Sequence, residues 1–439
     1  MSGIDLAPRD EARLAAEATW VLRGNDVGEY TKPSPRLYPH QWNWDSAFIA
    51  LGWAHLDWPR ATREVASLLR GQWTDGMLPH MIYNPHVVDY APGPEWWPEV
   101  PVRQSGVITS GISQPPVLPT AVYLVGLLQQ DTDARLAWWA DVYDALVDSV
   151  LYFSRHRTTA GSPLIVVVHP WESGADNSPR WDFVTGRGFA PSRRYRRVDT
   201  TIVQASARPT SRDYDLYMYL VELIATHRYD LRAYLSKTPF AVYDAFFNAA
   251  WYRAALDLNR IAAALGRSPA VAAGELDAFR DAYHRTLWNE DARLFLDFDL
   301  RGGRQIPSRT WAGLGAIYGG LVDAARAALM IESYRSRCQG HRQLPTTLPE
   351  DPGFDAARYW RGPVWVNVNW MIARGLEELG LMEPAAALAD ATLDLVRRAG
   401  WHEYFHAQTG EAVGGGDFSW TAALVLDLLR RPIATAPRG

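Results

Sequence analysis

Residues 241–265 read AVYDAFFNAAWYRAALDLNRIAAAL, and the fold class rests on the pattern of this stretch. Its apolar residues recur at intervals of three and four positions, which is the spacing of one face of an α-helix. Strand-like alternation is limited to two short runs, 163–168 and 294–300. The chain is therefore predicted to be all-α. The other segments with helical spacing are residues 11–22, 45–56, 60–72, 118–128, 136–153, 214–227, 274–288, 314–330, 366–379, 383–397 and 420–428.

The order of helices and loops predicts the domain organisation. No Gly-Ser or Pro-rich linker divides the sequence, so residues 1–439 are expected to form a single domain. About a dozen helices in hairpins, with a long loop after every second helix, are typical of a toroid of six helix pairs, the (α/α)6 barrel. Loops beyond about 12–15 residues in a compact domain are usually functional or disordered, and the many large aromatic residues of these loops favour a function. Three such loops, near residues 30–41, 73–119 and 167–213, are predicted to be lid-like insertions.

Charge and cysteine content exclude several classes of protein. Lys+Arg 44 against Asp+Glu 49 gives 44 − 49 = −5, which supplies no basic footprint for nucleic acid or an anionic membrane. The lone cysteine, Cys338, excludes an internal disulfide framework. Residues 1–22 lack the apolar run of a secretory signal, and the chain holds no apolar run long enough to span a bilayer. A cytoplasmic protein is expected; its oligomeric state is left open, and a homo-oligomer is compatible with the sequence.

Tryptophan is unusually abundant, with Trp 20 equal to Tyr 20 and above Phe 13. An indole N–H must find a partner when it is buried, so tryptophan is a costly residue for merely filling a core. The surplus indicates pockets in which flat apolar faces meet polar edges. Sugars fit such pockets, and so do aromatic cages for cations.

The first aromatic–polar motif is YPHQWNWDS at residues 38–46. Two indoles bracket Asn43, and Asp45 precedes a segment with helical spacing. Aspartate is a favoured N-cap residue, so Asp45 is predicted to cap that helix. The same carboxylate could also accept hydrogen bonds from sugar hydroxyls.

The second motif is HPWESGADNSPRWD at residues 169–182, which follows an apolar run. Its three carboxylates and two indoles lie close together in the sequence. A carboxylic acid held near indole has a raised pKa and keeps a proton ready for a leaving group. The competing interpretation is a polar turn with an internal hydrogen-bond network.

The third motif, WHEYFHAQTGE at residues 401–411, is followed by GGGDFSW at 414–420. The glycines are not a phosphate cradle, because no strand precedes them and no GK[ST] follows. Residues 402–406 match the letters of the zinc motif HExxH, which binds metal only on a helix. A loop is expected here, so neither a metal nor a cofactor is predicted. Asp417 or Ser419 is expected to cap the last helix.

Two arginine-containing segments complete the set of motifs. Residues 358–365, RYWRGPVW, form an aromatic–basic cluster before a helix. The run of Arg193, Arg194, Arg196 and Arg197 is interpreted as a solvated face. Arg208, beside a Pro-Thr turn, is the better candidate for binding an anion.

Taken together, these motifs resemble glycoside hydrolase family 63, especially its bacterial members that cleave glucosylglycerate or mannosylglycerate. The resembling segments span residues 38–411 in the family's order: YPHQWNWDS, HPWESGADNSPRW, RPTSRDY, RYWRGPVWVNVNW and HEYFHAQTGE. The pairing of an ESGxD block with a late glutamate is shared with trehalases. The resemblance is therefore specific for the clan and less specific for the substrate.

The resemblance implies an (α/α)6 barrel and an inverting glycosidase. Asp176 matches the family's general acid and Glu403 its general base, with Glu411 as a rival for the base. An inverting pair needs about 6.5–9.5 Å between its carboxyl groups, to leave room for water. Their pKa values must also be pushed apart, so that Asp176 is protonated and Glu403 ionised.

The resemblance also implies the residues around the substrate. Trp42, Asp45 and Trp365 are expected at the first sugar subsite. The second subsite is expected to contain Tyr38, Gln114, Arg208, Tyr214, Tyr359 and Trp360. Trp171 and Glu411 complete the expected substrate contacts.

The expected substrate is a small anionic glycoside, 2-O-α-D-glucosyl-D-glycerate or its mannosyl analogue. An Arg fork suits the glycerate carboxylate, which makes Arg208 the residue for that group. A trehalase or oligosaccharide α-glucosidase is the alternative within the clan, and a non-catalytic sugar-binding toroid is the alternative of another class. Choosing between glucose and mannose depends on contacts to a single hydroxyl, which these motifs do not resolve.

Overall fold

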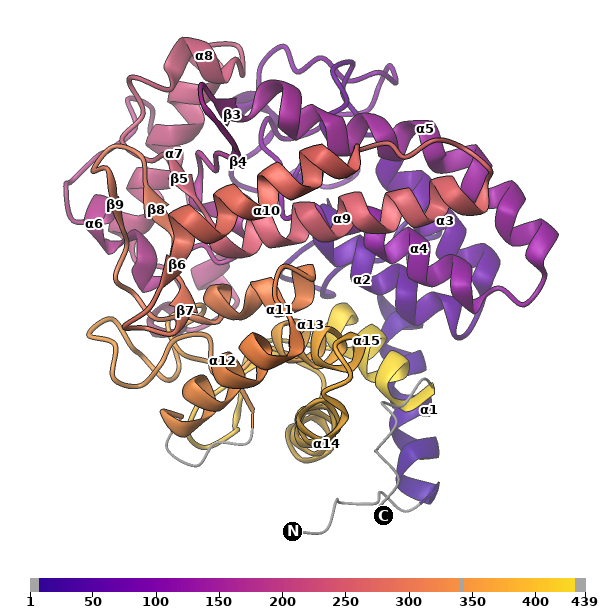
Figure 1. Cartoon of the computed structure of the whole chain (residues 1–439). Coiled ribbons are helices and arrows are strands. Elements are labelled where there is room, and N and C mark those ends of the chain that lie inside the picture. The colour runs from indigo at the N-terminus through magenta and orange to yellow at the C-terminus, as the bar shows by residue number, and fades with distance from the viewer. Residues whose placement is uncertain (1–7, 339–342, 431–439) are drawn as a thin grey trace.

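The computed structural model describes residues 8–338 and 343–430 and consists mainly of helices (Figure 1). Six helices form a closed inner ring, in which each contacts the next and the last contacts the first. In ring order they are α2 (Asn43–Ala54), α4 (Leu118–Leu128), α9 (Ala245–Ala264), α11 (Gly315–Gly319), α13 (Val366–Glu378) and α15 (Ser419–Arg430).

Each inner helix follows an outer one in the chain. The outer helices are α1 (Pro8–Asn25), α3 (Trp58–Leu69), α5 (Thr132–His156), α10 (Ala273–Leu287), α12 (Ala324–Ser336) and α14 (Met382–Ala399). Helix α1 packs on α15, α3 on α2 and α14 on α13, so the outer helices cover the ring from outside. This arrangement is the (α/α)6 barrel, and the predicted fold class is confirmed.

Inner and outer helices differ in sequence because they differ in environment. Almost every residue of α2 and α13 is buried, including polar ones such as Asn43 and Asn369. A helix that is apolar on all sides is stable only when protein surrounds it. Helix α3 instead buries one face and exposes Arg63 and Ala66 on the other. The buried side chains form one continuous cluster that runs through both layers.

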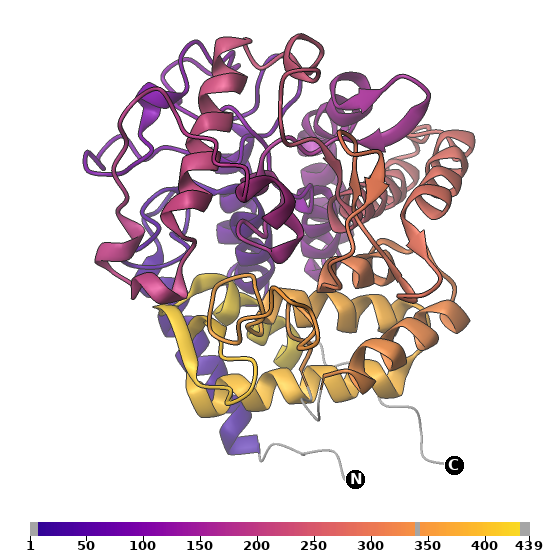
Figure 2. The ribbon, with the colours of Figure 1, turned by 90° about the vertical axis from the view of Figure 1, so that its left-hand side faces the viewer.

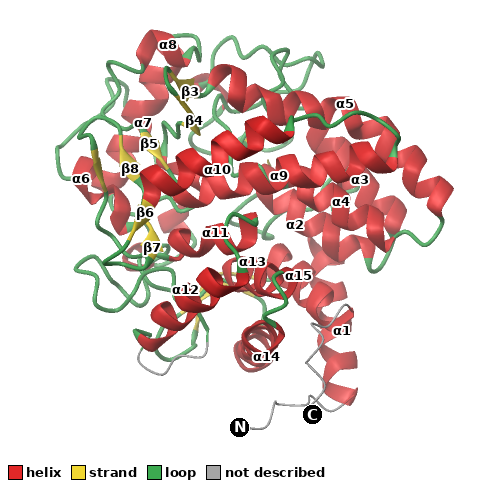
Figure 3. Ribbon diagram, viewed as in Figure 1, coloured by secondary structure: helices red, strands yellow, loops and turns green. Residues whose placement is uncertain are grey.

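The loops and strands gather at one end of the barrel (Figures 2 and 3). Every loop that leads from an outer helix enters an inner helix at its N-terminus, so these N-termini face the same end. The residues between α5 and α9 contain the additional helices α6 (Asp182–Thr185), α7 (Ser211–Thr226) and α8 (Leu231–Tyr234). Polar and aromatic residues of distant loops are thereby brought together above the ring.

The strands are short and antiparallel. Within the described residues they form four pairs, β1–β2, β3–β4, β6–β7 and β10–β11, and one three-stranded sheet with the order β5-β8-β9. Their bounds are β1 (Gln41–Trp42), β2 (Met81–Ile82), β3 (Thr158–Thr159), β4 (Ser162–Ile165), β5 (Val242–Tyr243), β6 (Trp288–Asn289), β7 (Leu294–Phe295), β8 (Phe298–Asp299), β9 (Arg304–Gln305), β10 (His402–Phe405) and β11 (Ala412–Gly416).

Two predicted elements are divided in the structure. The expected helix over 314–330 is two helices, because Gly320 adopts the left-handed conformation (φ 71°) at the end of α11 and the chain turns before α12. The expected strand over 294–300 is likewise two strands, β7 and β8, which pair with different partners. Apolar spacing continues across both breaks, so periodicity alone does not locate them.

The ring closes where the two ends of the chain meet. Helix α15 packs against both α1 and α2, and α15 lies beside α1 in Figure 1. A Cβ at Gly52 of α2 would lie 2.5 Å from the Cα of Ala423, so a glycine permits this close contact. The single-domain prediction covers 1–439, of which residues 1–7, 339–342 and 431–439 lie outside the described residues. No described helix combines the length and apolar character needed to cross a membrane.

Candidate active site

A cavity opens at the N-terminal ends of the inner helices. It holds about 750 Å³ of empty space, including the open solvent at its mouth. The positive ends of helix dipoles point toward this end, which favours anions there. Of the residues predicted from the sequence, those that line the cavity are Tyr38, Trp42, Asp45, Gln114, Trp171, Asp176, Arg208, Tyr214, Tyr359, Trp360 and Glu403.

Asp45 lies in the first turn of α2 and is not its N-cap. The cap position is occupied by Trp42, which makes no side-chain capping bond. The prediction that Asp45 caps the helix was therefore wrong, because the helix begins at Asn43 and frees this carboxyl group to face the cavity. Burial raises the pKa of the Asp45 carboxyl well above its usual range, and the charges of Glu403 and Asp176 add to that rise.

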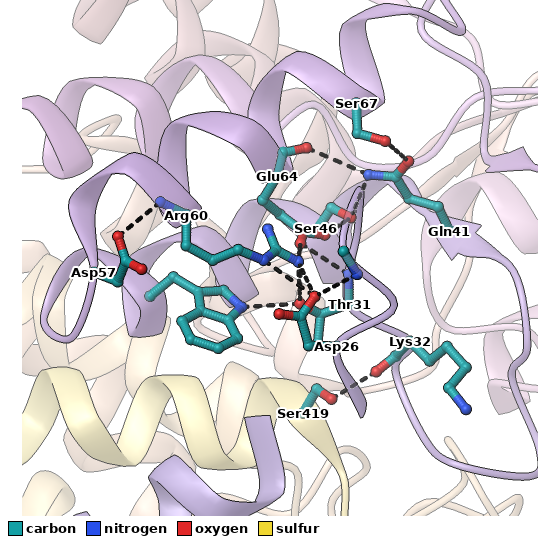
Figure 4. A network of polar contacts seen from close by, with 12 residues as sticks. Asp26, Thr31, Lys32, Gln41, Ser46, Asp57, Arg60, Glu64, Ser67 and Ser419 are labelled. Carbon is teal, nitrogen blue, oxygen red and sulfur yellow. Dashed lines mark hydrogen bonds and ion pairs between the residues drawn. The ribbon is translucent and has the colours of Figure 1, made fainter. Parts of the chain in front are cut away.

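A buried polar network holds the junction between β1 and α2 (Figure 4). The Ser46 hydroxyl donates to Glu64 Oε1 at 2.6 Å, and Gln41 Nε2 donates to Ser46 Oγ at 3.0 Å. Glu64, on α3, is paired with Arg60 at 2.9 Å, and neither side chain is more than 3% exposed. Trp42 and Asp45 lie between the two anchored residues Gln41 and Ser46, so the network fixes the backbone that presents them to the cavity.

The ESGxD segment divides its carboxyl groups between two roles. Glu172 is fully buried and forms a bidentate pair with Arg157, at 2.6 and 2.8 Å. It also accepts from the backbone amides of Ser113 and Val168, so its oxygens are directed into the protein. Asp176, four residues on, lines the cavity instead. The motif therefore contains both features that were considered: a hydrogen-bonded turn around Glu172 and a carboxyl group of Asp176 that faces the cavity.

The environment of Asp176 favours its protonated form. Burial raises the pKa of the Asp176 carboxyl to about 7; Arg208 opposes the rise, while Glu403 and Asp199 add to it. A carboxyl group with this pKa retains a substantial protonated fraction near neutral pH.

Glu403 lies on β10, 1% exposed, with both oxygens bonded. Tyr38 donates its hydroxyl proton to Oε1 at 2.6 Å, and Arg208 lies 3.4 Å from the same oxygen. The backbone amide of Gly415 donates to Oε2 at 3.1 Å. Burial raises the pKa of this carboxyl, while Arg208, Tyr38 and Gly415 lower it by stabilising the ionised form.

Arg208 is held in the wall of the cavity by an anion and by aromatic rings. Its Nε lies 3.3 Å from Asp199 Oδ2, and its guanidinium stacks 4.1 Å from the centre of the Tyr359 ring. Arg197 pairs with the same Asp199 at 2.7 Å and lies over Tyr214 at 4.0 Å. The two arginines and Asp199 thus form a connected group beside the cavity.

The basic run is a solvated face only in part. Arg193, Arg194 and Arg196 are exposed, as expected. Arg197 is not, because it is drawn inward by Asp199 and Tyr214. Arg193 stacks on Trp96 and Arg196 pairs with Asp89, so the exposed members still link the loops over 73–119 and 167–213.

Two predicted substrate contacts lie outside the cavity. Trp365 is 1% exposed and stacks directly behind Trp360, with ring centres 3.8 Å apart. It supports a cavity residue rather than facing the cavity, since the chain turns inward to begin α13 at Val366. Glu411 is exposed and accepts from Thr409 at the turn of the β10–β11 hairpin. The hairpin register places Glu403 toward the opposite end, so Glu411 is corrected to a surface residue.

The segment that matches the HExxH letters, residues 402–406, is not helical. His402 and Glu403 belong to β10, which pairs with β11, so the helical face required by that motif is not formed. Among the described residues, no group of three or more His, Cys, Asp or Glu side chains is arranged to hold a metal ion.

Several residues that line the cavity were not predicted. Trp44, Gly174, Phe418 and Trp420 lie within the quoted motifs, whose aromatic content was the available signal. His80 stacks on Trp171 with an interplanar angle of 7°, and burial lowers its pKa to about 3, so it is a neutral imidazole. Like His80, the remaining residues come from a loop without a recognisable motif: Met81, Tyr90, Ala91, Pro92 and Trp97.

An (α/α)6 barrel that brings buried carboxyl groups and indoles together at the mouth of its inner ring has the architecture of a glycoside hydrolase. Residues 38–421 match the model of the mannosylglycerate hydrolase MGH1-like glycoside hydrolase domain. The chain belongs to this family, and the resemblance to glycoside hydrolase family 63 is confirmed.

Relatives of similar length cover almost the whole chain. The mannosylglycerate hydrolase of Rubrobacter radiotolerans is 39% identical over 430 residues, covering 95% of this chain and 96% of that protein. The glucosylglycerate hydrolase of Mycolicibacterium hassiacum is 34% identical over 452 residues, covering 95% and 98%. The crystal structure of family 63 mannosylglycerate hydrolase from Thermus thermophilus, in complex with Tris and D-glycerate, matches with a TM-score of 0.88 at 38% identity, covering 94% and 99%.

Similarity to trehalases is more distant. The neutral trehalase Nth1 of Saccharomyces cerevisiae matches with a TM-score of 0.60 at 15% identity, covering 94% of this chain and 79% of that one. A likeness at this level shows a shared fold and does not bear on the substrate.

Proposed function

We propose that this protein is an inverting exo-α-glycosidase that hydrolyses 2-O-α-D-glucosyl-D-glycerate, its 2-O-α-D-mannosyl analogue, or both, to the free sugar and glycerate. The observation that carries the proposal is the joint position of Asp176, Glu403 and Arg208 on one cavity. The relatives named as hydrolases of these two glycosides, and the related structure with D-glycerate bound, support the substrate class.

In this mechanism Asp176 is the general acid and Glu403 the general base. The Asp176 carboxyl passes its proton to the glycosidic oxygen as the bond from that oxygen to the anomeric carbon breaks. The Glu403 carboxylate takes a proton from a water molecule, whose oxygen bonds to the opposite face of the same carbon. Asp176 ends ionised and Glu403 protonated, and exchange of protons with solvent restores both. The pKa of about 7 at Asp176 supports its role as the acid.

The remaining cavity residues divide between the sugar and the glycerate. Asp45 and the indole of Trp42 hold the sugar, with Asp45 accepting from its hydroxyl groups. Arg208 binds the glycerate carboxylate by charge-assisted hydrogen bonds, with Tyr38, Tyr214 and Tyr359 around it. The loops over 30–41, 73–119 and 167–213 act as lids over this pocket; the contacts of Arg193 and Arg196 across two of them support that role.

A trehalase is the second candidate within the clan, and the buried arginine distinguishes it from the proposal. A neutral disaccharide carries no carboxylate for Arg208, whose guanidinium lines the cavity next to Asp199 and Glu403. A non-catalytic sugar-binding protein has no need for a protonated Asp176 opposite a hydrogen-bonded Glu403, so the retention of both counts against it.

The test is a product assay on glucosylglycerate, mannosylglycerate and trehalose, with NMR identifying the anomer released first. We expect the β-anomer of the sugar from one or both glycerates and no turnover of trehalose. Asp176→Asn and Glu403→Gln should each lower kcat by at least about 10²-fold. Release of the α-anomer, or wild-type turnover by either variant, contradicts the mechanism.

A second arm of the assay addresses the anion contact. Arg208→Met should raise KM for glucosylglycerate far more than KM for a neutral aryl α-glucoside. A fall in kcat on both substrates is expected as well, because Arg208 also contacts Glu403. An equal rise of KM on both substrates removes the proposed contact with the carboxylate.

A further inference from the structure

The three glycines at 414–416 form a feature that neither a phosphate cradle nor a helix cap accounts for. They belong to β11, which pairs with β10 in the register Tyr404↔Val413 and His402↔Gly416. Between these two pairs, β10 contributes one residue, Glu403, and β11 contributes two, Gly414 and Gly415. Two residues opposite one define a β-bulge, a device that re-aims a side chain.

The first residue of the bulge has the conformation that favours glycine. Gly414 has φ +74°, in the left-handed region. The first residue of a G1 β-bulge is a glycine in this conformation. This geometry turns the amide of the next residue toward β10, where Gly415 N–H donates to Glu403 Oε2 at 3.1 Å. The bulge therefore supplies one of the hydrogen bonds that hold the carboxyl group.

A side chain at position 414 has no room. A Cβ built there would lie 2.6 Å from Glu403 Oε2, 2.9 Å from Glu403 Cβ and 2.6 Å from Tyr404 Cε1. Tyr404 is fully buried and donates its hydroxyl to the carbonyl of Ala207 at 2.7 Å, so its ring is fixed. An added methyl group would therefore press on Glu403, which supplies two of these three close contacts.

We propose that Gly414 is a positioning residue for Glu403. Because Gly414 carries no side chain, the β11 backbone can approach Glu403, and the Gly415 amide donates a hydrogen bond to Oε2. The Tyr38 hydroxyl donates to Oε1. The orientation of the base then depends on the hairpin as well as on Tyr38 and Arg208 in the cavity wall. This inference rests on the proposed role of Glu403 as the general base.

The test compares Gly414→Ala with two matched glycines of the same hairpin. Gly410 also has a positive φ, +71°, but the atoms nearest to a Cβ there belong to Leu395, at 3.1 Å, and Arg398, so Gly410→Ala also strains the backbone but away from Glu403. Gly416→Ala places a methyl group 3.5 Å from His402, an ordinary contact. Folding of all three is followed by thermal unfolding and circular dichroism.

Gly414→Ala should lower kcat at least about tenfold relative to Gly410→Ala, while KM stays within about twofold, since a displaced base slows chemistry more than binding. The acidic limb of its pH–rate profile should move to higher pH, because a carboxylate that loses hydrogen-bond donors ionises less readily. A purely structural role predicts no movement of that limb. The proposal is overturned if Gly414→Ala and Gly410→Ala have the same kcat and the acidic limbs of their pH–rate profiles lie at the same pH.

Failure of this inference is distinguishable from failure of the proposed function. If Glu403→Gln keeps full turnover, Glu403 is not the base, and both the proposed mechanism and the positioning role of Gly414 are contradicted. If Glu403→Gln is inactive but Gly414→Ala matches Gly410→Ala, only the positioning role falls. Should Gly414→Ala fold poorly, its loss in Tm is measured again in the Glu403→Ala background. A smaller loss there supports a clash with the Glu403 carboxyl, and an undiminished loss contradicts it.

Discussion

At the scale of single residues, the two central carboxyl groups differ both in exposure and in bonding, since Glu403 is buried and Asp176 is half-buried. Glu403 receives hydrogen bonds from Tyr38 and Gly415 and an ion pair from Arg208, all of which favour its charged form. For Asp176, burial raises the pKa to about 7, and Arg208 only partly offsets it. The proposed difference in roles thus rests on hydrogen bonding and burial, since the functional groups are chemically the same.

This difference predicts the pH dependence of the reaction. The acid must be protonated, so kcat/KM should fall as pH rises through about 7, the pKa of Asp176. The base must be ionised, so activity should also fall in acid, through the raised pKa of Glu403. A pH–rate profile of wild type measures both limbs.

Arg208→Met provides the internal control for that profile. Arg208 lowers the pKa of both carboxyl groups, so its loss should move both limbs to higher pH. An alkaline limb that stays in place in this variant would show that Asp176 is not the group titrating there.

At the scale of elements, the long helices could be predicted from their sequences and their junctions could not. The segment 241–265 carries its own periodicity, and the structure contains α9 over nearly the same residues. The division between α11 and α12 depends on the backbone conformation of Gly320, which apolar spacing does not report. Aspartate is a residue type favoured at helix N-caps, yet α2 begins before Asp45. The start of the helix is set by β1 and by the buried hydrogen bond from Gln41 to Ser46.

Those anchors give an element-scale prediction. Glu64→Gln should lower the free energy of unfolding by about 1–3 kcal/mol, because Arg60 loses the fully buried one of its two carboxylate partners and keeps only Asp26. Arg63→Gln, at the exposed neighbouring position of α3, should change it by no more than about 0.5 kcal/mol. Urea denaturation of the two variants measures the difference. Equal stability would mean that the network of Figure 4 does not hold α3 against the β1–α2 junction.

At the scale of the whole molecule, stability depends on closing a ring whose first and last inner helices are almost the full chain apart. The close approach of Gly52 to Ala423 joins α2 to α15. Gly52→Ala should therefore destabilise the protein by about 1–3 kcal/mol, by forcing these helices apart. Gly24→Ala is the matched control in α1, where nothing lies within 4 Å of the added methyl group.

Thermal unfolding distinguishes the two variants. Gly24→Ala should leave Tm unchanged or raise it slightly, since alanine favours a helix over glycine. If Gly52→Ala is as stable as wild type, the ring tolerates a larger distance between α2 and α15.

The sequence by itself determined the class of fold and the three motif blocks, because helical periodicity and residue chemistry are local properties. The choice of Asp176 and Glu403 within those blocks came from the family resemblance. Only the tertiary structure decided how those pieces meet. It brought together two carboxyl groups 403 − 176 = 227 positions apart, added His80 from a loop without a motif, set Trp365 behind Trp360 and turned Glu411 to the surface. These outcomes depend on ring closure and hairpin register, which are set by packing between segments distant in the sequence and leave no local pattern.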